Sequence, residues 1–222
     1  MSSDKKGILV VVSGFSGAGK GTIMKSLMKQ YGDLYALSVS ATTRDPRPGE
    51  VEGKDYFYVS KPEFEQMIKE DKLVEYAQYV GNYYGTPKAY VEEQLNSGKS
   101  VILEIEIQGA LKVKQKFPDT KLLFVTAPSA TQLKNRLIGR GTETSDVIEA
   151  RLKRACEESQ GIEQYDYLVI NDQLDDCVKH VHQILQAEKN GMSADNSSER
   201  ISANIDFIKN MRDELTGFSK GE

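Results

Sequence analysis

The feature that most constrains the fold is a glycine-rich loop between an apolar run and a helical pattern. The apolar run, ILVVVS at 8–13, has the length of a buried strand, and GFSGAGKGT follows directly at 14–22. Apolar residues then recur with helical spacing up to about Tyr31. Glycines in such a loop let successive backbone N–H groups point inward at a helix N-terminus, where they bind anions. The segment therefore predicts a phosphate-binding loop.

The loop has the residue spacing of a P-loop. Its residues expected to bind nucleotide phosphates are Gly14, Ser16, Gly17, Ala18, Gly19, Lys20, Gly21 and Thr22. Lys20 is long enough to reach the outer phosphates. The pattern places a serine or threonine directly after the lysine to hold Mg²⁺, whereas here Gly21 comes first and the hydroxyl follows at Thr22. Thr22 is therefore the candidate Mg²⁺ ligand, and the sequence leaves its role open.

Strand-like runs alternate with helical patterns along most of the chain. This alternation is typical of an α/β fold with a parallel sheet flanked by helices, and the run at 101–107 predicts a second central strand. Between 34 and 87 the chain is instead rich in Tyr, Thr, Ser, Gly and Pro, which predicts a small mixed-β insertion. The predicted organisation is a P-loop core at 1–33 and 88–189, this insertion, and a C-terminal segment at 190–222.

The C-terminal segment combines a polar linker with an amphipathic helix. Four apolar residues form one stripe along this helix: Ile201, Ile205, Ile208 and Leu215. Such a stripe either packs on the body of the protein or binds a partner, which includes a second copy of the chain. The sequence leaves the choice between monomer and homo-oligomer open.

The overall charge excludes one class of function. The 222 residues carry 29 basic and 33 acidic side chains, a net charge of −4, so the chain has no broad positive field for nucleic acids and must bind phosphates locally. No apolar run approaches the roughly 20 residues that a membrane span requires, and the N-terminal run is too short for a secretory signal. We expect a cytoplasmic protein without nucleic-acid or membrane partners.

The insertion contains residues suited to a second phosphorylated substrate. Arg44 and Arg47 lie in a loop rich in proline and glycine, with Tyr56 shortly after. Two guanidinium groups and a phenol suit a phosphate monoester, because the guanidinium donors match its oxygens in pairs. The alternative is that both arginines are solvated surface charges.

A carboxylate in the same insertion is a candidate for reading a base. Glu75 lies among apolar and aromatic residues, with Tyr84 and Thr86 nearby in sequence. A carboxylate in a pocket accepts hydrogen bonds from two N–H groups on one edge of guanine, an edge that adenine lacks. The alternative is an exposed strand glutamate without such a role.

Six motifs in one order resemble the guanylate kinases: GFSGAGKGT, SVSATTRDPRPGEVEGKDYFYV, VEYAQYVGNYYGTP, LEIEIQG, RGTET and VIND. The resemblance extends from about Gly7 to Glu188. It implies the P-loop nucleoside monophosphate kinase fold, with a parallel core sheet, a mixed-β GMP-binding insertion at 34–87 and a helical lid at about 136–151.

The resemblance also implies roles for individual residues. Besides the P-loop, the residues implied in ATP binding are Arg136, Arg140 and Asn171. Those implied in GMP binding are Ser40, Arg44, Arg47, Tyr56, Glu75, Tyr84, Thr86, Glu104 and Glu106. Those implied in catalysis are Lys20, Arg44, Arg140 and Arg151. Glu104 and Glu106 stand where many family members have aspartates, and their separate roles stay open.

The implied activity is the reversible transfer of the γ-phosphoryl group of ATP to GMP or dGMP, with Mg²⁺, in purine nucleotide metabolism. Because two phosphorylated substrates repel each other, the insertion and lid are expected to close over them. Two alternatives remain: a catalytically inactive guanylate-kinase-like interaction module, and a kinase for another nucleoside monophosphate.

Overall fold

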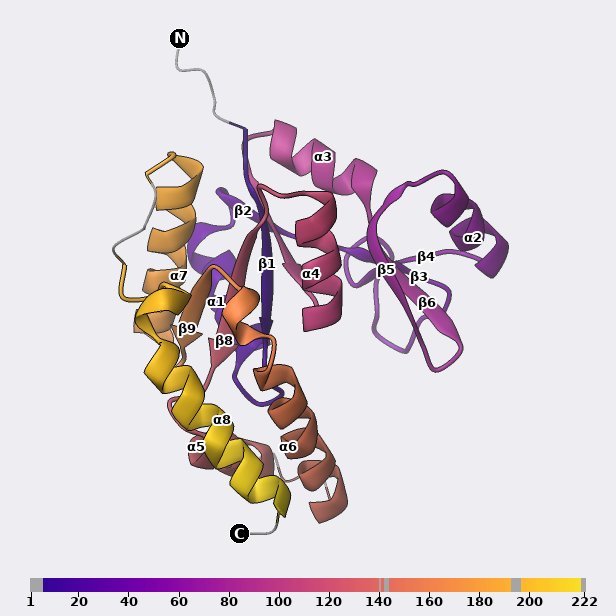
Figure 1. Cartoon of the computed structure of the whole chain (residues 1–222). Helices are drawn as coiled ribbons and strands as arrows, with labels where there is room; N and C mark the ends of the chain where they lie inside the picture. The colour runs from indigo at the N-terminus through magenta and orange to yellow at the C-terminus, as the bar shows by residue number, and fades with distance from the viewer. Residues whose placement is uncertain (1–5, 140, 142–143, 193–196, 221–222) are drawn as a thin grey trace.

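The core of the protein is a five-stranded parallel sheet with strand order β2-β7-β1-β8-β9 (Figure 1). The computed structural model describes residues 6–139, 141, 144–192 and 197–220. The strands of this sheet are β1 Leu9–Gly14, β2 Tyr35–Leu37, β7 Ser100–Glu104, β8 Lys121–Thr126 and β9 Tyr167–Ile170. The central strands are built from Val, Leu and Ile that are fully buried, as expected where helices cover both faces of a parallel sheet.

Helices cover both faces of this sheet. They are α1 Lys20–Tyr31, α3 Lys88–Asn96, α4 Ile107–Lys116 and α7 Leu174–Lys189. Helices α5 Ala130–Ile138 and α6 Ser145–Ser159 lie past the carboxyl ends of the strands and contact each other (Figure 1). On one face α1 packs against α7, and on the other α3 and α4 contact β7 and β1 (Figure 1). The carboxyl ends of the parallel strands meet at one edge, where the loop between β1 and α1 lies, and this edge is where such sheets bind ligands.

A second, four-stranded sheet with order β4-β3-β6-β5 projects from the core (Figure 1). Its elements are β3 Ser40–Thr42, β4 Tyr56–Tyr58, α2 Lys61–Lys69, β5 Leu73–Tyr79 and β6 Asn82–Pro87. It has its own small apolar cluster around Ala41, Phe64 and Leu73. The α/β fold with a mixed-β insertion is therefore confirmed.

Two boundaries differ from those expected from the sequence. Strand β2 pairs in parallel with β7, so the chain leaves the core sheet only after Leu37, not at residue 34. A strand of three residues is too short to show a hydrophobic period in the sequence. Only the folded chain, in which Tyr35 is completely buried, shows that these residues belong to the core sheet. The strand expected at 101–107 ends at Glu104, because Glu106 is already the N-cap residue of α4.

The insertion also contains a helix that the sequence analysis did not single out. Helix α2 begins after a capping box, in which Ser60 accepts a hydrogen bond from the Glu63 N–H while the Glu63 carboxylate accepts one from the Ser60 N–H. Ser-x-x-Glu with an intervening proline is a helix-start signal that could have revealed this helix.

The C-terminal segment docks on the body of the protein. After the short 3₁₀ turn Ile201–Ala203, helix α8 Ile205–Lys220 packs across α6 and α5 (Figure 1). Ile208, Met211 and Leu215 are buried in this contact. The apolar stripe predicted from the sequence is therefore used in packing within the chain at Ile208 and Leu215. Ile201 is also buried but lies in the 3₁₀ turn before the helix, and Ile205, at the start of α8, is 48% exposed, so the prediction was wrong at these two positions. Among the described residues, no helix has both the length and the apolar character needed to cross a membrane.

Candidate active site

The P-loop runs from the end of β1 to the first turn of α1. Gly14 lies so close to β8 that a Cβ atom there would be 2.1 Å from the Val125 carbonyl oxygen. Gly19 has φ 92°, and a Cβ atom there would be 2.4 Å from Asn171 Nδ2. Both positions therefore require glycine, one for a close backbone approach and one for a left-handed conformation as well.

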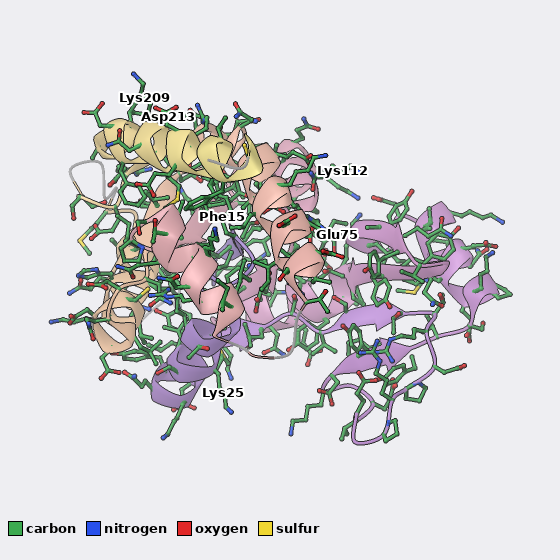
Figure 2. The ribbon with its side chains drawn as sticks, turned by 90° about the horizontal axis from the view of Figure 1, so that it is seen from below. Phe15, Lys25, Glu75, Lys112, Lys209 and Asp213 are labelled. Carbon is green, nitrogen blue, oxygen red and sulfur yellow. The ribbon has the colours of Figure 1, made fainter. Side chains whose placement is uncertain are left out.

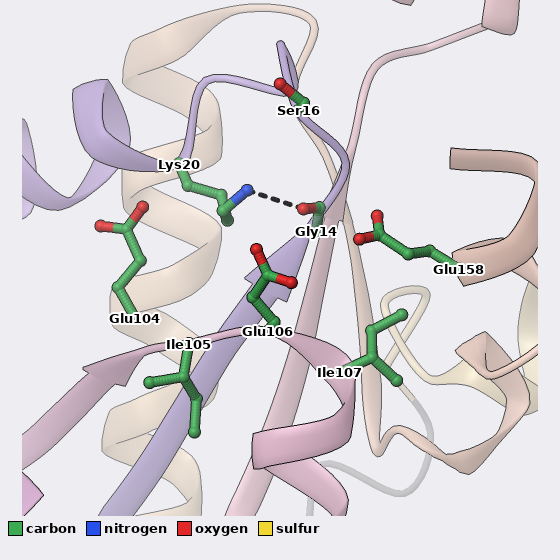
Figure 3. Close-up of a pocket in the computed structure, with 8 residues that line it drawn as sticks. All are labelled: Gly14, Ser16, Lys20, Glu104, Ile105, Glu106, Ile107 and Glu158. Carbon is green, nitrogen blue, oxygen red and sulfur yellow. Dashed lines mark hydrogen bonds between the residues drawn. The ribbon is translucent and has the colours of Figure 1, made fainter. Parts of the chain in front are cut away.

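Lys20 is folded back over the loop. Its Nζ donates to the carbonyl oxygens of Gly14 at 2.6 Å and Phe15 at 3.2 Å (Figure 3). These contacts hold the ammonium group at the mouth of a cleft of about 310 Å³. A cation at the N-terminus of α1, beside backbone N–H groups, is the arrangement that binds nucleotide phosphates.

Three carboxylates surround Lys20 in this cleft: Glu104, Glu106 and Glu158 (Figure 3). Desolvation raises the pKa of Glu104 and that of Glu158, and the positive charge of Lys20 opposes both shifts. Arg154, on α6, forms ion pairs with Glu106 and with Glu158, the latter at 3.0 Å. The cleft therefore brings Glu104 and Glu106 close to Lys20 and the P-loop.

Asn171, the residue directly after β9, anchors the loop. Its Nδ2 donates to the Ala18 carbonyl oxygen at 2.8 Å, while its own carbonyl oxygen accepts from Arg136 Nη2 at 2.8 Å. Arg151, on α6, donates from Nη1 to Ser16 Oγ. The structure thus gathers around the P-loop two residues implied in ATP binding, Arg136 and Asn171, and one implied in catalysis, Arg151. Arg140 lies outside the described residues.

Arg44 is held in place by a carboxylate that the sequence analysis missed. Glu50 accepts from Arg44 Nη2 at 2.8 Å, from the Arg47 backbone N–H at 2.7 Å and from Tyr58 Oη at 2.8 Å. These donors lower the pKa of Glu50 to about 2, and burial together with Glu50 raises the pKa of Tyr58 to about 12. Glu50 follows Arg47 by three residues, a turn spacing that could have suggested its contact with the Arg47 N–H but not its pairing with Arg44.

Aromatic rings complete this cluster. The Arg44 guanidinium lies 5.3 Å from the centre of the Tyr56 ring, and the rings of Tyr56 and Tyr84 are 6.0 Å apart. Ser40 is the strand partner of Tyr56 in the β3–β4 ladder. The arrangement presents an oriented cation between two phenols, which suits a phosphate monoester. The Arg47 side chain is exposed beside it.

Glu75 and Thr86 meet between β5 and β6. Thr86 is fully buried, and its Oγ1 donates to Glu75 Oε1 at 2.8 Å. Burial raises the pKa of Glu75, and the hydrogen bonds from Thr86 and the charge of Lys112 oppose the rise. A half-buried carboxylate with one oxygen held by a hydroxyl keeps acceptor capacity for a ligand's N–H groups.

Hard oxygen donors for Mg²⁺ lie beside Lys20. Thr22 and Glu104 both line the hollow in front of the P-loop. Mg²⁺ in nucleotide sites usually takes only one or two protein oxygens, with the remaining ligands from phosphates and water. The donor set therefore fits such an ion, with the hydroxyl one residue later than in the usual pattern.

The predicted site residues thus fall into three groups: those at the P-loop, those around Arg44, and the pair Glu75 and Thr86. Glu104 and Glu106 join the P-loop group. The residues missed by sequence reasoning are Glu50, Tyr58, Arg154 and Glu158. The spacing of Arg154 and Glu158 on one helix face was a usable signal for an ion pair, but their position in the cleft was not.

The fold is a parallel sheet with a P-loop at the carboxyl ends of its strands and an insertion that presents an oriented arginine, which is the architecture of a nucleotide kinase of the P-loop class. The family model for guanylate kinase matches residues 6–188. The chain therefore belongs to the guanylate kinase family, which confirms the resemblance of its motifs.

Individual relatives agree with the family match. The guanylate kinase of Oceanobacillus iheyensis is 53% identical over 184 residues, which cover 83% of this chain and 89% of that protein. That of a Clostridium perfringens strain is 52% identical over 186 residues, 84% of this chain and 86% of that protein. Among solved structures, the guanylate kinase of Anaplasma phagocytophilum is similar with a TM-score of 0.63 and 31% identity, covering 83% of this chain and 87% of that one.

Proposed function

We propose that this chain transfers the γ-phosphoryl group of ATP to GMP or dGMP, giving ADP and the nucleoside diphosphate, as part of cytoplasmic purine nucleotide metabolism. The observation that carries the proposal is the Glu75–Thr86 pair in an insertion that also holds Arg44. A base-reading carboxylate and a phosphate-binding arginine on one small sheet suit a purine monophosphate as acceptor.

On the donor side, the P-loop amides and Lys20 would hold the β- and γ-phosphates of ATP. Phosphoryl transfer needs alignment and neutralisation of charge more than covalent help, so the positive groups at this edge of the sheet are the catalytic groups. Arg151 would bring a further positive charge to the transferring group from α6, and Arg140 is proposed for the same role. Arg136 and Asn171 would border the ATP base.

On the acceptor side, Arg44, Arg47, Tyr56 and Tyr84 would bind the GMP phosphate. Ser40, Glu75 and Thr86 would bind the guanine edge, with Glu75 accepting from N1–H and the 2-amino group. Glu104 and Glu106 would lie between the two substrates, near the ribose and near the phosphates. Glu50 holds Arg44 ready for the incoming phosphate, since the guanidinium has further donors beyond those used by Glu50.

Mg²⁺ would be held by Thr22, with Glu104 nearby, and when bound it neutralises charge between the ATP phosphates. The domain division follows from the same roles: the core binds the donor, the insertion after Leu37 binds the acceptor, and the segment at about 136–151 acts as a lid. Closing the insertion and lid over the substrates would exclude water that hydrolyses ATP.

The test is an ADP-release assay with ATP and Mg²⁺ that offers GMP, dGMP, AMP, CMP, UMP and dTMP in parallel. We expect turnover with GMP and dGMP only. Turnover with AMP instead would favour a kinase for another monophosphate. Folded protein that binds GMP but turns over none of these nucleotides would favour the interaction module.

A variant pair locates the acceptor site. Glu75→Gln is expected to lower kcat/KM for GMP by about 10²-fold or more, because sites built to bind polar groups discriminate by about 10⁴-fold when a partner is missing. The KM for ATP should change little. Glu92→Gln, an exposed residue on α3, is the matched control. Equal losses for both substrates in Glu75→Gln would contradict the assignment.

A further inference from the structure

A groove of about 290 Å³ separates strand β5 of the insertion from helix α4 of the core. Glu75 lines it from β5, and Lys112 and Lys116 line it from α4. Figure 2 shows Lys112 and Glu75 near each other on this side of the molecule. The candidate base-reading carboxylate therefore has two lysines of the core facing it across the groove.

The α4 backbone approaches Glu75 closely at one point. A Cβ atom built at Gly109 would lie 3.7 Å from Glu75 Oε2, whereas Oε1 accepts a hydrogen bond from Thr86. Gly109 thus places the start of α4 in near-contact with the carboxylate. Lys112 follows three residues later on the same helix face, and it lines the groove together with Glu75.

The two lysines have different surroundings. Lys116 Nζ donates to Asp71 Oδ1 at 2.5 Å and to the Leu73 carbonyl oxygen at 3.1 Å, so its charge is already matched locally. Asp71 is also paired with Lys88. The charge of Lys112 acts on Glu75 itself, where it opposes the effect of burial on the pKa of that carboxyl.

We propose that Lys112 is a positioning residue for the acceptor site, which keeps the carboxylate of Glu75 ionised and turned toward the guanine edge. The inference rests on the proposed role of Glu75 as the guanine-reading group. It adds a residue that does not touch the substrate and acts through a neighbouring carboxylate.

The charge of Lys112 should shift the pH range over which Glu75 binds guanine. A protonated Glu75 offers one carbonyl acceptor and one donor, so it cannot accept from two guanine N–H groups. Removing the Lys112 charge raises the Glu75 pKa. As the pH is lowered, the variant should therefore stop recognising GMP at a higher pH than the unmodified protein does. The other titratable groups near Glu75 are Tyr76 on the same strand, and Lys116 and Asp71, which are paired with each other.

The experiment compares Lys112→Met, Lys112→Arg and, as a matched control, Lys209→Met, which removes an exposed lysine from α8 on a distant surface (Figure 2). The kcat/KM for GMP is measured between pH 4.5 and 8 for each variant and for the unmodified protein. We expect the acidic limb to move upward by on the order of half to one pH unit in Lys112→Met only. Lys112→Arg should restore the original profile, and the KM for ATP should stay constant.

A second measurement does not depend on turnover. Carbon-13 NMR titration of the Glu75 carboxyl, assigned with Glu75→Gln, should show a higher pKa in Lys112→Met than in the unmodified, substrate-free protein. An unchanged titration, or a pH profile that does not follow it, overturns the role of Lys112. Absence of GMP turnover in the unmodified protein contradicts the proposed function instead, and the NMR result then still decides whether Lys112 controls the charge of Glu75.

Discussion

Arg151 Nη1 donates a hydrogen bond to Ser16 Oγ at 2.5 Å, which joins helix α6 to the P-loop across 135 residues of sequence. The same helix contributes Glu158 to the cleft around Lys20. A cationic group on α6 is therefore already seated beside the phosphate-binding loop before any nucleotide is bound.

Arg151→Ala should lower kcat by on the order of 10³-fold, by analogy with other arginines that stabilise the charge of a transferring phosphoryl group. The KM for GMP should change far less, because Arg151 lies at the donor loop. Steady-state kinetics with both substrates varied will measure the two effects. Lys153→Met, an exposed residue two positions along α6, is the control and should keep near-normal kcat. A loss confined to the KM for GMP in Arg151→Ala would contradict the assignment.

Gly19→Ala should destabilise the fold and abolish nucleotide binding. Its φ of 92° is unfavourable for alanine, typically by about 1–2 kcal/mol, and the new Cβ atom would lie 2.4 Å from Asn171 Nδ2. Urea unfolding and ATP titration will measure both losses.

Gly21→Ala provides the matched control for that variant. A Cβ atom at Gly21 meets no atom within 4 Å, and the residue is in the first turn of α1. Alanine in a helix is favoured over glycine by about 0.5–1 kcal/mol, so stability should stay equal or rise. If both variants lost similar stability and ATP affinity, the left-handed conformation of Gly19 would not be the cause of the loss.

Glu188→Gln should destabilise the protein at neutral pH by about 1–3 kcal/mol, the usual cost of breaking buried hydrogen bonds to a charged group. The Glu188 side chain is 6% exposed and accepts from Tyr167 Oη, Lys121 Nζ at 2.9 Å and Arg200 Nη2 at 3.3 Å. Burial alone would raise the pKa of Glu188, but these three donors outweigh it and lower the pKa.

The stability lost in Glu188→Gln should decrease as the pH falls. Since the pKa of Glu188 is lower in the folded than in the unfolded state, its stabilisation is present above the unfolded value, about 4.3, and is lost as the pH falls through the folded value. Urea unfolding at pH 7 and at pH 4 and below should show the difference between Glu188→Gln and the unmodified protein shrinking with acidity. A difference that is constant with pH would rule out the ionised carboxylate as its source. Glu92→Gln is the control.

Leu215→Ala should destabilise the protein by about 2–5 kcal/mol, the range for truncating a fully buried leucine. Leu215 has no exposed surface in the contact of α8 with α6 and α5. Asp213→Ala, on the outward face of the same helix, should change stability by less than about 0.5 kcal/mol (Figure 2). Thermal and urea unfolding will compare them. Equal effects would mean that the burial of Leu215 in this contact contributes little to stability.

Much of the fold and the donor site could be predicted from contiguous sequence. The strand, loop and helix around Lys20 could be predicted from their own residues. The conformational freedom of the glycines, the apolar periodicity and the spacing of the lysine are all local properties of the sequence. The alternation of strand-like and helical patterns predicted the parallel sheet for the same reason. Helix α2 was predictable in the same way, because the Ser60–Glu63 capping box is a local signal for a helix start.

Other features were decided only by the tertiary structure. The three-residue strand β2 is too short to carry a period, and its place in the core sheet depends on pairing with β7, some 65 residues later. Glu50 as the partner of Arg44 depends on how the intervening loop turns back.

The sequence by itself therefore determined which groups can bind phosphates and a base. Short motifs contain both the residue types and the local spacing that such binding needs. Only the tertiary structure decided which of them meet. Strand order brings Asn171 to Ala18, the position of α6 brings Arg151 to Ser16, and the packing of α4 against β5 sets Lys112 near Glu75. Such neighbours are far apart in sequence, so their contact follows from the packing of whole elements and from no local preference of the chain.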